Sequence, residues 1–197
     1  MSIHARPAHL SLMAAAFALV ACAKTETPAA DTSAAAPPPA PAPAAAPAIT
    51  DAQIAHIVVT ANAIDSSAGV LAKAKGTSKG VKDFGQTMIA DHGGVNKQAV
   101  ALATKLGVSP EENDVSRSLK SGADANVANL NSLSGAAFDK AYIDHEVEYH
   151  QAVLDALDKT IVPNAQNPEL KALLEKARPA FVAHLDRAKS VQASLAK

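Results

Sequence analysis

Apolar residues recur every three or four positions along four long stretches of the chain after residue 49, with polar residues between them. That spacing gathers the apolar side chains on one face of an α-helix. Alternation of β-branched and polar residues is rare, so strands are not expected. The pattern predicts long helices over residues 50–76, 78–106, 134–159 and 168–197, and a weaker helix over residues 114–133.

The residues at the ends of these stretches favour helix termini. Thr50 begins a capping-box pattern, and Gly76 follows the last apolar position of the first stretch. Asn167 followed by Pro168 predicts the start of the last helix, after a loop over residues 163–168. We therefore predict an all-α fold, a four-helix bundle in which the weaker helix is a short crossover that covers one side.

Each of the four apolar stripes is interrupted by one ionisable residue, and in a bundle such inward groups can converge at one level. Glu146 lies four positions before His150 and therefore shares its helix face. Imidazole and carboxylate groups together suit zinc, copper, iron or manganese. The sequence predicts a transition-metal site formed by Asp65, His92, His150, His184 and Glu146.

The same histidines also have a purely structural interpretation. Buried imidazoles can be held by hydrogen bonds to one another, to Tyr142 or Tyr149, or to water. Outside the set, we expect His56 to be solvated and His145 to point away from the site. Asp91 could orient a histidine of a neighbouring helix, although we expect it to be exposed. Both interpretations stay open at this point.

Two local features should distort the helices. Gly93 and Gly94 follow the inward-facing His92 and predict a close backbone approach or a bend. Pro179 removes a helical hydrogen bond and predicts a kink one turn before His184.

The first 21 residues have the pattern of a secretory signal peptide, with Arg6 before an apolar run over residues 10–18 that is too short to span a bilayer. The sequence Leu-Val-Ala-Cys ending at Cys22 resembles the lipobox of bacterial lipoproteins. That resemblance implies cleavage before Cys22, lipidation of its thiol and amine, and anchoring to a membrane, with sorting to the outer membrane. The alternative is an ordinary signal peptide with a chance cysteine.

Composition divides the remaining chain in two. Residues 28–48 contain seven prolines and eleven alanines and no apolar periodicity, which predicts an extended tether over residues 22–48. Residues 49–197 should form one compact domain that contains no cysteine. The precursor carries a net charge of −1 and shows no basic patch or aromatic platform, so nucleic-acid binding is not expected.

Several motifs, among them Met-Ile-Ala-Asp-His ending at His92, Tyr-His-Gln-Ala-Val starting at Tyr149 and Arg-Pro-Ala-Phe starting at Arg178, resemble a bacterial family. The family comprises secreted ferritin-like helical bundles of unknown function, often labelled outer-membrane proteins. The resemblance covers residues 51–196. It implies the ferritin-like fold and histidines at positions 92, 150 and 184, with a glutamate usual where this chain has Asp65.

The Glu-x-x-His motif of di-iron carboxylate proteins is missing, because Ile89, Val147 and Phe181 stand three residues before the histidines. Iron storage or ferroxidase activity is therefore not expected. We expect a periplasmic, lipid-anchored bundle that binds a transition-metal ion. The competing interpretation is a non-catalytic envelope module with structural histidines, which binds a protein partner that the sequence does not identify. Enzymatic activity ranks third, because no catalytic motif is present.

Overall fold

The computed structural model describes residues 49–197. The predicted signal peptide, Cys22 and the proline-rich tether lie outside the described residues. Within residues 49–197 all regular structure is helical and no strand occurs, which confirms the predicted all-α bundle. The elements are α1 (Asp51–Lys75), α2 (Lys79–Lys105), α3 (Asp114–Ser132), α4 (Gly135–Ala156), the π-helical turn η1 (Leu157–Ile161), α5 (Val162–Asn164) and α6 (Pro168–Leu195).

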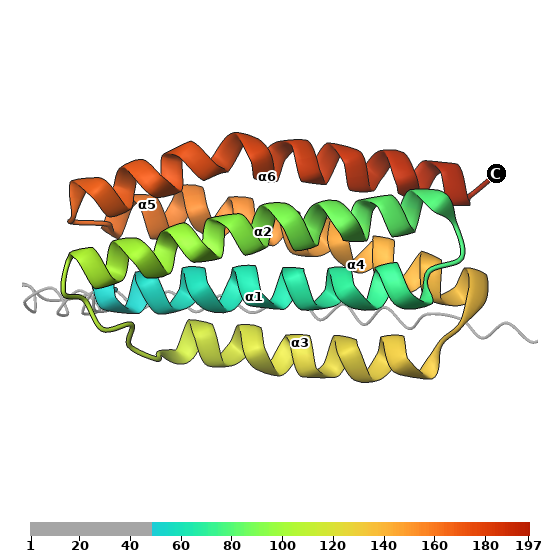
Figure 1. The fold of residues 1–197 in the computed structure, drawn as a ribbon, viewed down its shortest axis with the longest axis horizontal. Coiled ribbons are helices and arrows are strands. Elements are labelled where there is room, and N and C mark those ends of the chain that lie inside the picture. Colours follow the sequence, from blue (N-terminus) through green and yellow to red (C-terminus); the bar gives the residue numbers. More distant parts are fainter. Residues whose placement is uncertain (1–48) are drawn as a thin grey trace, which may run out of the picture. The chain divides into compact units, whose positions relative to one another are not determined.

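Four long helices, α1, α2, α4 and α6, run side by side along the long axis (Figure 1). The shorter α3 links α2 to α4 and lies alongside α1 on the outside of the bundle. By length and composition α1 could cross a membrane. In this fold it is instead a core helix that packs against α2, α3 and α4.

The predicted helix starts are confirmed by capping contacts. The Thr50 side chain accepts a hydrogen bond from the Gln53 amide while the Gln53 side chain binds the Thr50 amide, so both halves of the capping box form. Ser78 caps α2, and Asn167 caps α6 immediately before Pro168. These contacts satisfy amide groups that have no partner within the helix.

The end of α4 differs from the prediction. The helix continues through a π-helical turn, in which the Val162 amide donates to the Leu157 carbonyl, and then through α5. The predicted loop over residues 163–168 is therefore reduced to residues 165–167. Pro163 lies directly after this π-helical turn, in the first turn of α5. At the other proline, Pro179, α6 continues unbroken, and Figure 1 shows that helix bowed along its length.

The close backbone approach predicted at Gly93 and Gly94 is wrong, because a Cβ at either position would meet no heavy atom within 4 Å. The close approach occurs instead between α1 and α2 at Gly69 and Gly85. A Cβ on Gly69 would lie 2.6 Å from the Gly85 carbonyl oxygen, and a Cβ on Gly85 would lie 2.7 Å from the Gly69 carbonyl oxygen. Glycine is required at both positions for the two backbones to meet.

The core has two apolar parts, one in each half of the bundle, and polar residues separate them. We call one part the close-packed half; its buried members include Ala72, Phe84, Met88, Leu130 and Phe138. We call the other the hollow half; its buried members include Ile57, Val58, Leu157, Ile161 and Leu174. Along α1, α2 and α4, buried ionisable residues fall between the two parts. Together with one histidine of α6 they form a group that we call the polar layer: Asp65, His92, Glu146, His150 and His184.

Candidate metal centre

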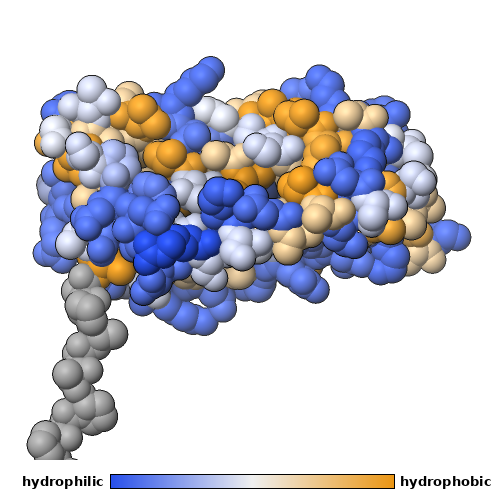
Figure 2. Space-filling view, turned by 90° about the horizontal axis from the view of Figure 1, so that it is seen from below, coloured by the Kyte–Doolittle hydropathy of each residue, from blue (hydrophilic) through white to orange (hydrophobic). Residues whose placement is uncertain are grey.

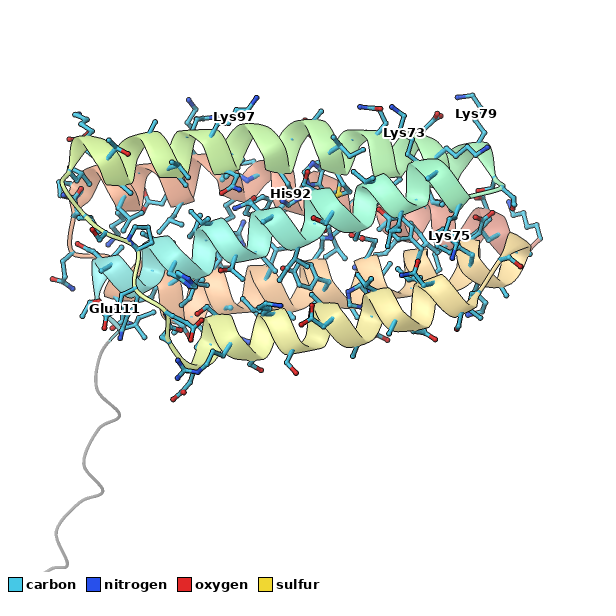
Figure 3. All side chains as sticks on the ribbon, turned by 60° about the horizontal axis from the view of Figure 1, so that its bottom comes forward. Lys73, Lys75, Lys79, His92, Lys97 and Glu111 are labelled. Atoms are coloured by element: carbon cyan, nitrogen blue, oxygen red, sulfur yellow. The ribbon has the colours of Figure 1, made fainter. Side chains whose placement is uncertain are left out.

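The polar layer brings together all five predicted ligand residues. Asp65 comes from α1, His92 from α2, Glu146 and His150 from α4, and His184 from α6. Each is at most 5% exposed. Figure 3 shows His92 pointing into the bundle, whereas lysines such as Lys79 and Lys97 point outward. These residues therefore face the interior of the bundle, as the apolar stripes predicted, and the packing of the helices brings them to one level.

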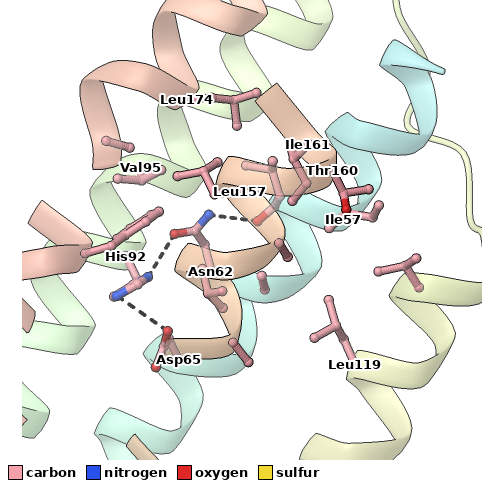
Figure 4. Close-up of a pocket in the computed structure, with 18 of the residues that line it drawn as sticks. Ile57, Asn62, Asp65, His92, Val95, Leu119, Leu157, Thr160, Ile161 and Leu174 are labelled. Carbon is pink, nitrogen blue, oxygen red and sulfur yellow. Dashed lines mark hydrogen bonds and ion pairs between the residues drawn. The ribbon is translucent and has the colours of Figure 1, made fainter. Parts of the chain in front are cut away.

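His92 is oriented by a residue that the sequence analysis missed. Its Nδ1 lies 2.9 Å from the side-chain oxygen of Asn62, and the amide nitrogen of Asn62 donates to the Val58 carbonyl at 2.8 Å (Figure 4). Because the amide nitrogen is used on Val58, the amide oxygen faces the imidazole and accepts from Nδ1–H. The lone pair of His92 is therefore on Nε2, which faces the centre of the layer.

His184 is oriented from the surface. Its Nε2 donates to a carboxylate oxygen of Asp91 at 2.9 Å, and the Asp91 side chain is 49% exposed. Asp91 is thus both exposed, as expected, and the residue that fixes the tautomer of a neighbouring histidine. The lone pair of His184 is then on Nδ1, which lies 3.2 Å from Nε2 of His92.

His150 is oriented by its own helix. Its Nδ1 donates to the Glu146 carbonyl at 2.9 Å, which leaves the lone pair on Nε2. That Nε2 is buried and has no hydrogen-bond partner among the described residues. It lies 3.9 Å from a carboxylate oxygen of Asp65, and the same oxygen lies 3.5 Å from Nε2 of His92.

The three imidazoles therefore share one arrangement: the outer nitrogen donates a proton to an acceptor, and the inner nitrogen presents a lone pair. Ring nitrogens of His92, His150 and His184 lie within 4.8 Å of one another. Nitrogens bound to one tetrahedral zinc ion would lie about 3.3 Å apart, given bonds of about 2.0–2.1 Å. Two lone pairs 3.2 Å apart repel unless a cation or a proton lies between them. The arrangement suits a metal ion.

Asp65, Glu146 and His150 form a second group of possible ligands, also within 4.8 Å of one another. Both carboxylate oxygens of Glu146 and the hydroxyl of Tyr142 are buried and lack a hydrogen-bond partner among residues 49–197. Unpartnered buried oxygens are costly and call for a partner such as a cation or an ordered water. Hydrogen bonds from Tyr142 or Tyr149 to the histidines, one form of the structural alternative, do not occur among the described residues, since the Tyr149 hydroxyl donates to the Ala61 carbonyl and the Tyr142 hydroxyl has no partner there. Another form, contact between imidazoles, is present between His92 and His184.

Burial sets the charge of the polar layer. It lowers the pKa of His92 to about 3, helped by the nearby His150 and His184, and it lowers the pKa of His150 to about 4. Burial raises the pKa of Asp65 to about 7, and it raises the pKa of Glu146 well above its usual value, helped by the nearby Asp65. Neutral imidazoles with available lone pairs are the form that binds metal.

Aromatic rings enclose the layer. Phe181 stacks on His92 with ring centres 5.2 Å apart and planes inclined by 3°, and Phe84 meets His150 edge-on at 6.2 Å. The two other histidines of residues 49–197 lie elsewhere: half-buried His145 stacks on Tyr149, and half-buried His56 contacts Thr60. Both positions agree with the prediction that neither belongs to the set.

Fold and site together define a class: an all-α bundle whose buried histidine and carboxylate groups could hold a metal ion. The chain belongs to the family described as domain of unknown function (DUF4142), whose model matches residues 36–191. The match begins within the segment that we predicted to be a tether. Neither the curated proteins nor the solved structures contain a match to this chain.

Proposed function

We propose that this protein binds one transition-metal ion in the polar layer of a ferritin-like bundle. The ligands are Nε2 of His92, Nε2 of His150, Nδ1 of His184 and the Asp65 carboxylate, with Glu146 as a further carboxylate beside Asp65. The observation that carries the proposal is the shared orientation of the three imidazoles. Each outer nitrogen is bound to an acceptor and each inner nitrogen directs its lone pair toward the centre of the layer, which is how metal-binding histidines are normally held.

The ligand set narrows the choice of ion. Three imidazole nitrogens with a carboxylate suit zinc, copper, iron or manganese rather than calcium or magnesium, which prefer all-oxygen ligands. A structural zinc site of four protein ligands, or a site with Glu146 as fifth ligand, both fit the residues present. Only two carboxylates lie in the layer, fewer than the four of di-iron carboxylate proteins.

We further propose that Cys22 is lipid-modified and holds this bundle on the periplasmic side of the outer membrane. The support is the lipobox that ends at Cys22 and the proline-rich segment that follows it. Mass spectrometry of the native N-terminus should find acyl groups on Cys22. An unmodified Cys22, or cleavage at another residue, would refute lipid anchoring without affecting the metal proposal.

Calorimetric titration of the metal-stripped protein with zinc tests the proposed metal site. His150→Ala removes a ligand and should weaken zinc binding at least a hundredfold, whereas His56→Ala should leave it unchanged. Asp91→Ala leaves the core intact but frees the outer nitrogen of His184, and should weaken binding about tenfold to a hundredfold. Asp83→Ala, an exposed carboxylate of the same helix, is its matched control.

Equal zinc affinity in the wild type and His150→Ala, or no affinity in either, would contradict the proposal. The histidines would then be structural, and the envelope-module interpretation would replace the metal site.

A further inference from the structure

A cavity of about 360 Å³ lies in the hollow half and reaches the polar layer (Figure 4). Its volume is within the range of small-molecule binding sites. Asp65, His92 and Asn62 belong to its wall. Most of the remaining wall is hydrocarbon, including Ile57, Val58, Leu157, Ile161, Leu174 and Phe181.

The cavity is elongated and connects to the surface. On α1 its wall extends from Ile57 to Asp65, which is about 12 Å at 1.5 Å per residue. The wall also includes Val115, which is 43% exposed, and the exposed residues Ala152 and Thr160. Val115 belongs to α3, and Figure 2, which shows the side that carries α3, shows hydrophobic patches between hydrophilic ones. A ligand could therefore enter from the surface and reach the polar layer.

The π-helical turn η1 forms part of this wall. Leu157 and Ile161, at the two ends of the turn, are both buried and both line the cavity, as does Thr160. Turns of this kind are rare and occur frequently at functional sites. Here the irregular turn coincides with the cavity and not with the close-packed half.

The chemistry of the wall restricts the occupant. An elongated apolar cavity favours a hydrocarbon chain, because the binding free energy improves with the apolar surface area of the ligand that is removed from water. Within residues 49–197, Asp65 is the one carboxylate that lines the cavity, and no lysine or arginine of this part of the chain does so. An anionic group that reached the inner end would therefore need the metal ion as its counter-charge.

We propose that the cavity binds an aliphatic carboxylic acid, with its hydrocarbon chain along the apolar wall and its carboxylate as a fifth ligand of the metal ion, beside Asp65 and His92. The position of the carboxylate rests on the proposed function, whereas the position of the chain rests on the cavity alone. No bond is made or broken, and the acid is a bound ligand.

Decanoate titrated into the zinc-loaded and the metal-free protein tests this proposal. The full chain carrying Cys22→Ser is suitable, because without the Cys22 thiol it carries no acyl group that could compete with decanoate. Decanoate should bind the zinc-loaded protein at least tenfold more tightly than the metal-free protein. Ala156→Phe, which fills the cavity from α4, should weaken decanoate binding at least tenfold and leave zinc binding unchanged. Ala137→Phe, at an exposed position of the same helix, should change neither.

A second variant keeps the test decisive if Ala156→Phe fails to fold. Ala177→Phe fills the same cavity from α6, and Ala193→Phe, exposed on that helix, is its control. No decanoate binding to zinc-loaded protein, or full binding by the cavity-filling variants, would overturn the proposal. Equal decanoate affinity with and without bound zinc would overturn the placement of the carboxylate. Failure of zinc itself to bind would refute the proposed function separately, and decanoate binding lost in Ala156→Phe would still locate the chain in the cavity.

Discussion

The two halves of this bundle are built from the same helices and similar apolar residues, yet they pack differently. In the close-packed half, α1 and α2 meet backbone to backbone at Gly69 and Gly85, and residues such as Phe84, Met88 and Leu130 are at most 1% exposed. In the hollow half, the same pair of helices contributes to the wall of a cavity that reaches the polar layer. One half is therefore packed closely enough for two backbones to touch, and the other half retains space.

Truncating one leucine in each half should give the largest difference in the free energy of unfolding. Leu130→Ala should lower the free energy of unfolding by about 3–5 kcal/mol, because Leu130 is fully enclosed. Leu174→Ala should cost about 2 kcal/mol, because Leu174 already borders the cavity and its removal extends an existing space. Urea unfolding of both variants measures the difference. Equal losses would mean that the cavity does not lower the cost of truncation.

The ionisable groups of the polar layer should determine how the stability of the metal-free protein depends on pH. Asp65 and Glu146, with raised pKa values, hold protons in the folded state that the unfolded chain releases above about pH 4, so they favour folding at low pH. His92 and His150, with lowered pKa values, stay neutral when folded while the unfolded chain binds protons below about pH 6.5. Their contribution is present above pH 6.5 and is lost as the pH falls.

Between about pH 4.5 and 6.5 these two contributions oppose each other, so the stability of the metal-free wild type should fall only slightly with pH, through His145, whose pKa burial also lowers. Asp65→Asn removes one carboxyl and leaves one histidine unopposed. The stability of that variant should therefore fall by about 1.4 kcal/mol for each pH unit below 6.5. Urea unfolding across this range provides the measurement. A wild type that follows the same slope as Asp65→Asn would show that the carboxyls are ionised in the folded protein.

The glycine contact of the close-packed half offers a smaller test. Gly85→Ala places a Cβ 2.7 Å from a carbonyl oxygen of α1 and should destabilise the bundle by about 1–3 kcal/mol. Gly94→Ala, on the same helix, meets nothing within 4 Å and should stabilise it by up to about 1 kcal/mol through helix propensity. Thermal unfolding of the two variants measures whether each substitution lowers or raises the stability. A stabilising Gly85→Ala would show that α1 and α2 can separate without cost.

The sequence predicted the helices and the inward faces well, because both depend on residues a few positions apart. Asp65, His92, His150 and His184 were found from the spacing of apolar residues along single helices, and Glu146 from its spacing to His150. What could not be predicted depends on contacts between helices or on a local irregularity. The glycine pair at which α1 and α2 meet was misplaced, since glycine spacing within one helix does not indicate which glycine faces another backbone.

Asn62 was missed although it lies four positions after Val58 and three before Asp65 on the same stripe of α1, which was a usable signal. Its role depends on a hydrogen bond to α2 that periodicity cannot show. The π-helical turn was missed as well, because Leu157 and Ile161 fit an ordinary helical stripe, so the cavity beside it had no sequence signal.

If one ion lies among the three oriented imidazoles, anomalous diffraction should locate it. On crystals of the zinc-loaded Cys22→Ser chain, data at the zinc absorption edge should show one strong peak about 2.0–2.1 Å from Nε2 of His92, Nε2 of His150 and Nδ1 of His184. A fully folded protein with no peak in the polar layer, or with zinc bound only at surface residues, would contradict the proposed metal site.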